Sequence, residues 1–127
     1  MSRSEAVTDG LRVEVEARYA PELSGPGQWF FLYTIRISNE SHETCQLLSR
    51  HWRISDATGQ VQEVRGPGVV GEQPVLEPGQ SFEYTSGCPL QTPMGTMEGS
   101  YEMVTEDGDH FDAQVALFSL REPGALH

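Results

Sequence analysis

The sequence lacks a long hydrophobic run. No stretch of its 127 residues approaches the roughly 20 consecutive apolar side chains of a membrane-spanning helix. Its first nine residues also lack the apolar segment that defines a secretory signal peptide. We therefore expect no membrane insertion and a cytoplasmic location.

Basic residues are few. Lysine and arginine together number 8 against 19 acidic residues, which gives a net charge of −11. A surface of that sign repels nucleic acid backbones and anionic lipids, so we expect no nucleic acid partner. Mutual repulsion between copies suggests a monomer or a small homo-oligomer.

Cysteines are also scarce. Cys45 and Cys88 are the two in the chain, with neither Cys-x-x-Cys spacing nor the density of a disulfide framework. We interpret both as free thiols, which suits a reducing compartment.

No ten-residue window shows a helical period, and alternation of polar and apolar residues dominates instead. The alternation is clearest at 11–19 and 29–39. Further strands are predicted at 45–56, 60–65, 81–86, 96–105 and 110–120, with a fragment at 75–76. Within them, we expect Leu48, Trp52 and Ile54 to share one face, and Leu117 to continue the inward face of the last strand.

About seven short antiparallel strands with regular turns predict an all-β protein. Two packed sheets, forming a β-sandwich that is immunoglobulin-like in topology, fit this pattern, and a partly open barrel is the alternative. The length and the 37% hydrophobic content are those of one globular domain. We expect a single domain over 1–127, with its core at about 9–122 and a loose tail at 123–127.

A glycine-rich segment, Gly66-Pro-Gly-Val-Val-Gly71, follows Arg65 and has the spacing G-x-G-x-x-G. Dinucleotide-binding folds place that pattern before a helix, and none can be placed here, which excludes the Rossmann interpretation. Two interpretations stay open. The loop amides and Arg65 could form an anion nest, or the loop could simply cross between the sheets.

A second cluster surrounds a tryptophan. Arg50 and His51 precede Trp52, and strand alternation places Arg50 on the same face as Trp52. Because a buried unpaired guanidinium is costly, Arg50 must pair with a carboxylate, reach solvent at the end of the sheet, or follow a β-bulge. A structural ion pair beside a core tryptophan is the simplest interpretation.

No complete catalytic or metal site is present in the sequence. Thr85-Ser-Gly-Cys88 offers a hydroxyl and a thiol, but it forms no nucleophile elbow and no histidine is tied to it. The available metal ligands show no recognised spacing; they are His42, Cys45, His51, Cys88, His110, Asp107, Asp109 and Asp112. We therefore expect no enzymatic activity, no cofactor and no metal.

Several long motifs resemble one family. They are Arg50-His-Trp-Arg-Ile-Ser-Asp56, Val64-Arg-Gly-Pro-Gly-Val-Val-Gly-Glu-Gln-Pro74, Leu76-Glu-Pro-Gly79, Tyr84-Thr-Ser-Gly87 and Met94-Gly-Thr-Met-Glu-Gly-Ser-Tyr101. With the closing Asp107-Gly108 hairpin and Phe111, they are similar to the ApaG family over about residues 9–122. The resemblance implies a fibronectin type III-like sandwich, protein binding in related domains, and in bacteria a link to cobalt and magnesium efflux.

These observations lead to two functional hypotheses. The first is a non-enzymatic module that binds an unidentified protein through the region from Arg50 to Pro74. The alternative is a sensor that holds pyrophosphate or a dinucleoside polyphosphate at the glycine loop, although Pro67 removes one amide donor from it. The candidate binding residues are Arg50, His51, Arg65, Gly66, Gly68, Val69, Val70 and Gly71.

Overall fold

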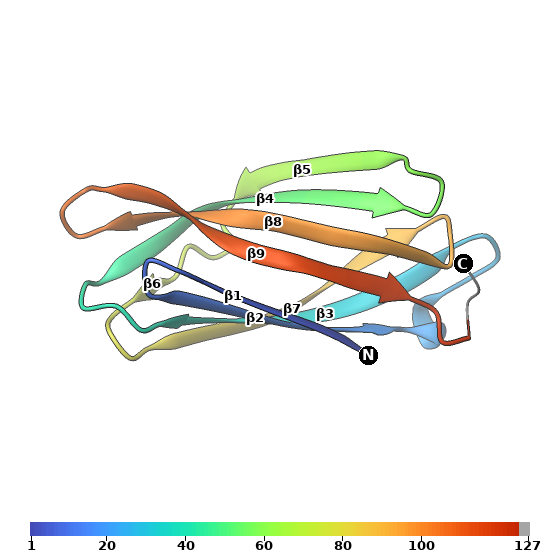
Figure 1. The fold of residues 1–127 in the computed structure, drawn as a ribbon, viewed down its shortest axis with the longest axis horizontal. Coiled ribbons are helices and arrows are strands. Elements are labelled where there is room, and N and C mark those ends of the chain that lie inside the picture. The colour runs from blue at the N-terminus through green and yellow to red at the C-terminus, as the bar shows by residue number, and fades with distance from the viewer. Residues whose placement is uncertain (125–127) are drawn as a thin grey trace.

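The computed structural model describes residues 1–124, and two antiparallel sheets pack against each other in it (Figure 1). The first sheet has the order β1-β2-β3-β7, with β1 (Ser2–Thr8), β2 (Leu11–Tyr19), β3 (Trp29–Asn39) and β7 (Ser81–Leu90). The second has the order β5-β4-β8-β9, with β4 (Cys45–Asp56), β5 (Val61–Pro67), β8 (Met94–Thr105) and β9 (His110–Arg121). The short β6 (Val75–Leu76) pairs with β4, and η1 (Pro21–Leu23) is a single 3₁₀ turn. The predicted all-β sandwich is confirmed.

The core lies between the sheets because alternate residues of each strand point inward. In β2 the inward set is Leu11, Val13, Val15 and Ala17, and in β3 it is Phe31, Tyr33, Ile35 and Ile37. Trp52 of β4 lies at the centre, with its ring edge-on to Tyr33, Tyr101 and Phe118. No helix among residues 1–124 is long and apolar enough to cross a membrane.

Two β-bulges correct the predicted faces. Between Leu47 and Ser49 the pairing of β4 with β8 shifts, so Leu47 is buried where Leu48 was expected. The pairing of β8 with β9 shifts between Met97 and Gly99. Phe118 therefore fills the core, and Leu117 is 52% exposed. An extra residue reverses the inward and outward sets, which a strict alternation cannot anticipate.

Among residues 1–124 the strand count is nine rather than about seven, because β1 was missed and the fragment at 75–76 forms β6. The expected core at 9–122 left out β1, whose polar residues give no hydrophobic alternation. Residues 125–127 of the expected loose tail lie outside the described residues.

The outer strand β1 is sealed against β9, the outer strand of the other sheet. The Ser2 hydroxyl donates to the carbonyl of Ser119, and Ser4 Oγ donates to the carbonyl of Ala116 at 2.8 Å. The amide of Gln114 donates to Thr8 Oγ1 at 3.1 Å. Hydroxyls of β1 thereby satisfy backbone groups of β9. The remaining outer strands, β5 and β7, form the opposite side of the sandwich (Figure 1).

Candidate functional site

The guanidinium of Arg50 holds the start of the glycine segment. Arg50 follows the bulge between Leu47 and Ser49 and lies on the inner face with Trp52, opposite buried Tyr101 on β8. Its Nη1 donates to the carbonyls of Pro67 and Gly68, both at 2.9 Å. Of the three options the sequence left open, the bulge applies. The expected ion pair is wrong, since Arg50 meets backbone carbonyls and no carboxylate within residues 1–124.

Gly66 makes room for that contact. It pairs directly with Arg50 in the β4–β5 ladder, and a Cβ on Gly66 would lie 3.0 Å from Arg50 Nη2. A glycine at this position therefore lets the guanidinium cross the strand and reach the loop beyond.

The loop ends in a two-residue hairpin. Val69 N donates to the carbonyl of Glu72 at 2.8 Å, and Glu72 N donates back to Val69 at 2.9 Å. Both residues at the tip have positive φ, 43° for Val70 and 81° for Gly71. These are the features of a type I′ turn, whose first position normally holds asparagine, aspartate or glycine. A β-branched residue in that conformation is strained.

The segment contains two apolar pairs, Val69-Val70 and Val75-Leu76, and the two members of each pair point in opposite directions. Val69 is 1% exposed and Leu76 is 3% exposed, so both belong to the core, whereas Val70 is 54% and Val75 is 55% exposed. One residue of each pair therefore belongs to the core and the other to the surface. Val69 was expected to contact a partner, and that expectation is wrong because its side chain is enclosed.

The loop is anchored along β4 as well. Gly68 N and Gln73 Nε2 both donate to the carbonyl of Leu48, at 2.9 and 2.8 Å. Leu47 N donates to the carbonyl of Pro74 at 3.0 Å. The bulge therefore serves two purposes, since it allows both Leu47 and Arg50 to lie on the inner face and its residues bind the loop. The segment between β5 and β6 is held at both ends.

Most of the backbone amides that an anion nest at this loop would need are not available. The amides of Gly68 and Val69 already donate to backbone carbonyls, and Pro67 has no N–H. Val70 and Gly71 are the loop residues whose amides donate to no carbonyl within the described chain. Two adjacent amides make a shallow nest at most.

His51 and Arg65 lie on the outer face of the sheet, away from Arg50. They are paired across β4 and β5, and His51 Nε2 lies 3.0 Å from Glu63 Oε1. The predicted binding residues are therefore divided among three places. Arg50 and Val69 face the interior, His51 and Arg65 face outward, and Val70 and Gly71 form the tip.

Beneath Arg50 lies a buried group of phenols and one thiol. The hydroxyls of Tyr84 and Tyr101 hydrogen-bond to each other, and burial raises the pKa of both above its ordinary value. Burial also raises the pKa of Cys88 to about 11. At neutral pH Cys88 is therefore a protonated, enclosed thiol, which is a poor nucleophile.

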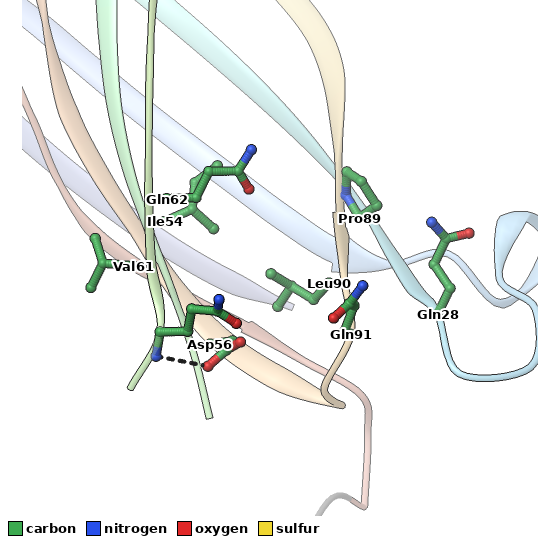
Figure 2. Close-up of a pocket in the computed structure, with 9 residues that line it drawn as sticks. Gln28, Ile54, Asp56, Val61, Gln62, Pro89, Leu90 and Gln91 are labelled. Carbon is green, nitrogen blue, oxygen red and sulfur yellow. Dashed lines mark hydrogen bonds between the residues drawn. The ribbon is translucent and has the colours of Figure 1, made fainter. Parts of the chain in front are cut away.

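A cleft of about 480 Å³ opens between the two free sides of the sandwich, at the far end of β5 from the loop tip. Ile54 and Gln62 lie on one side of it and Pro89 and Gln28 on the other (Figure 2). Its lining residues come from four segments of the chain: Gln28, Ile54, Asp56, Gln60, Val61, Gln62, Pro89, Leu90 and Gln91. No local motif joins these residues, so this cleft has no signal in the sequence.

Asp56 is the one charged side chain of the cleft, and it is engaged in a turn. Its Oδ1 accepts hydrogen bonds from Thr58 N at 2.8 Å, Thr58 Oγ1 at 2.6 Å and Gln60 N at 3.1 Å. These bonds hold the pKa of Asp56 below its usual value. As for metals, no group of three or more histidine, cysteine, aspartate or glutamate side chains among residues 1–124 is placed to share an ion.

Comparison with known proteins gives close relatives over nearly the whole chain. The model of the ApaG domain matches residues 20–105. Protein ApaG of Methylorubrum populi is 58% identical over 120 residues, 93% of this chain and 92% of that protein. Protein ApaG of Anaeromyxobacter dehalogenans is 53% identical over 124 residues, 98% of this chain and 99% of that one.

Solved structures agree with the fold. The crystal structure of the ApaA protein from Bordetella pertussis has a TM-score of 0.87 and 53% identity, covering 91% of this chain and 95% of that one. The C-terminal domain of Wzt has a TM-score of 0.56 at 12% identity, covering 98% of this chain and 80% of that one, and so shares the fold alone.

Proposed function

Because the chain belongs to the ApaG family, we propose that it is a non-enzymatic module that binds another protein through the loop tip at Val70. One observation carries this role. Val70 is exposed, β-branched and at positive φ, on a loop that is otherwise fully anchored.

Val70 takes a costly backbone conformation although it is 54% exposed. A left-handed backbone costs a residue with a Cβ about 1–2 kcal/mol. Asparagine or glycine would form the same turn with less strain. Strain that the fold does not need is typical of binding sites, and an exposed apolar side chain at the tip of a turn can enter a pocket of a partner.

The anchoring of the loop supports the same role. Arg50, Leu47 and Leu48 hold the segment on one side, and buried Val69 fixes the base of the turn. A loop that is already ordered loses little conformational entropy when it binds. Loops on a rigid sandwich are common recognition surfaces.

The test is recovery of a partner from cell extract by immobilised protein. Val70→Asn should abolish recovery while the protein stays folded, because asparagine keeps the turn and removes the apolar contact. Val7→Asn is the matched control, since Val7 is an equally exposed valine on β1. Recovery that survives Val70→Asn, or that is lost equally with Val7→Asn, would reject the assigned tip.

The anion sensor can be separated from this role by an amide NMR titration with pyrophosphate and diadenosine tetraphosphate. Protein binding alone predicts no localised shifts over residues 66–71, because only two of the loop amides are available. A saturable shift at Val70 and Gly71 would favour the sensor instead. On the protein-binding hypothesis, a link to cobalt and magnesium efflux would act through the partner.

A further inference from the structure

The strand β5 leaves one edge of the second sheet open. It is the outermost strand of that sheet in Figure 1, with β4 on its other side. Hydroxyls of β1 cover β9, which leaves β5 and β7 as the uncovered outer strands. Each carries one proline near its end, Pro67 in β5 and Pro89 in β7, and a proline cannot donate to a neighbouring strand.

The hydrogen bonds to β4 determine which backbone groups of β5 are available. At the two ends of the ladder, Asp56 N donates to the carbonyl of Gln60 and Gly68 N donates to that of Leu48. Both bonds involve even-numbered residues on the β5 side. Since hydrogen-bonded positions alternate along an antiparallel strand, the odd-numbered residues direct their N–H and C=O groups toward the open edge.

The side chains at those odd positions have opposite charges. Glu63 and Arg65 are both exposed on the outer face of the sheet. Glu63 Oε1 contacts His51, whereas Arg65 makes no ion pair with any residue from 1 to 124. Val64 stands between them and points inward, against the core.

We infer that two copies of this chain pair antiparallel through their β5 strands, about a two-fold axis at Val64. In that register Glu63 of each copy lies opposite Arg65 of the other. The backbone groups of these two residues face each other as hydrogen-bonded pairs, and Val64 meets Val64 at the axis.

Charge selects this register over its neighbours. Centring the pair on Glu63 would oppose two glutamates, and centring it on Arg65 would oppose two arginines, both of which are unfavourable. Only the register at Val64 places Glu63 opposite Arg65. It spans Val61–Pro67, where Pro67 can accept a hydrogen bond from Val61 of the other copy but can donate none. The net charge of −11 on each copy opposes association, so the dimer is reversible and depends on concentration.

This interface is separate from the proposed partner-binding tip, because the paired residues end at Pro67. The two therefore fail independently. A chain that dimerises but recovers no partner would reject only the proposed binding tip. A chain that stays monomeric but recovers a partner would reject only the proposed dimer.

Sedimentation of the full chain at physiological ionic strength, from micromolar to millimolar concentration, tests the inference. The wild-type mass should rise from 14.1 kDa toward twice that value. Glu63→Arg or Arg65→Glu should each raise the dissociation constant by about tenfold or more, because two attractive pairs become repulsive. Glu98→Arg is the matched control on central strand β8, and it should leave the dimer unchanged.

Combining the two changes makes the test specific for the register. The double variant Glu63→Arg with Arg65→Glu should recover the dimer, since each arginine again faces a glutamate. An equal mixture of the two single variants should form heterodimers while each alone stays monomeric. Amide exchange of Glu63 and Arg65 should slow as concentration rises.

The contrary results are equally clear. A wild-type chain that stays monomeric at millimolar concentration would overturn the inference. So would single variants that dimerise as the wild type does, because the interface would then lie elsewhere. A double variant that stays monomeric would reject the register.

Discussion

The hydroxyls of Tyr84 in β7 and Tyr101 in β8 meet 2.5 Å apart, and so join the two sheets through one buried hydrogen bond. Tyr101 is fully enclosed, whereas Tyr84 keeps a small exposed surface. No buried side-chain polar atom of residues 1–124 lacks a partner. This hydrogen bond therefore allows the core to bury two phenol hydroxyls without leaving either one unpaired.

The losses of unfolding free energy caused by removing the two hydroxyls should not be additive. Tyr84→Phe leaves the Tyr101 hydroxyl buried without a partner, and should lower the free energy of unfolding by about 1–3 kcal/mol. Tyr101→Phe should cost less, because Tyr84 keeps a small exposed surface whereas Tyr101 has none. The double variant should be more stable than the sum of the single losses predicts. Urea unfolding of the four proteins measures this cycle, and strict additivity would contradict it.

Stability should fall in alkali. Burial raises the pKa of Tyr84 and Tyr101 above 10.0 and that of Cys88 from 9.0 to about 11, so the unfolded chain releases these protons first. Their contribution to stability is fully present below pH 9 and is lost as the pH rises from there. The urea concentration at the midpoint of unfolding should decrease as the pH rises above 9. The decrease should be smaller in the double variant that carries both Tyr84→Phe and Tyr101→Phe. A constant midpoint up to pH 11 would show that these groups titrate normally.

Asn39 should be among the most sensitive polar residues. Its Nδ2 donates to the carbonyls of Glu43 and Leu76 at 2.8 and 2.9 Å, and its Oδ1 accepts from Ser41 N at 3.0 Å and Ser41 Oγ at 2.6 Å. Asn39→Ala leaves these groups without their partner and should cost about 3 kcal/mol. Ser41→Ala, the control, breaks bonds at the exposed end of the network and should cost about 1 kcal/mol. An equal loss in both variants would contradict the central place of Asn39.

Val70→Asn should stabilise the protein, by about 0.5–1 kcal/mol, because asparagine accepts the positive φ that valine resists. Gly71→Ala should act in the opposite direction by about 1 kcal/mol, since Gly71 has a φ of 81°. Thermal unfolding with Val7→Asn as the surface control measures both. A destabilised Val70→Asn would mean that the valine side chain contributes packing not evident from its exposure.

The sequence predicted the strands whose inward faces are regular. In β2 and β3 polar and apolar residues alternate without interruption, so their positions and faces were both predicted correctly. Prediction failed where backbone geometry or polar contacts decide. The bulge at Leu47 and Ser49 depends on pairing with β8. The polar strand β1 pairs with β2 from Ser2 to Thr8, and its hydroxyls bond to a strand more than a hundred residues away.

The candidate site was predicted only in part for the same reason. The glycine segment indicated an unusual loop, but composition could not separate buried Val69 from exposed Val70, since a tight turn sends adjacent side chains in opposite directions. The contact of Arg50 with two carbonyls also depends on the bulge before it. The glutamine-lined cleft combines distant segments and has no local signature.

The seam between β1 and β9 has a consequence for the order of folding. Because Ser2 and Ser4 bond to the carbonyls of Ser119 and Ala116, β1 can complete these contacts only after β9, more than a hundred residues later in the chain, has been synthesised. The pairing of β1 with β2 is local and needs no such delay. We therefore expect the seam between β1 and β9 to close late in folding, after the local strand pairs have formed.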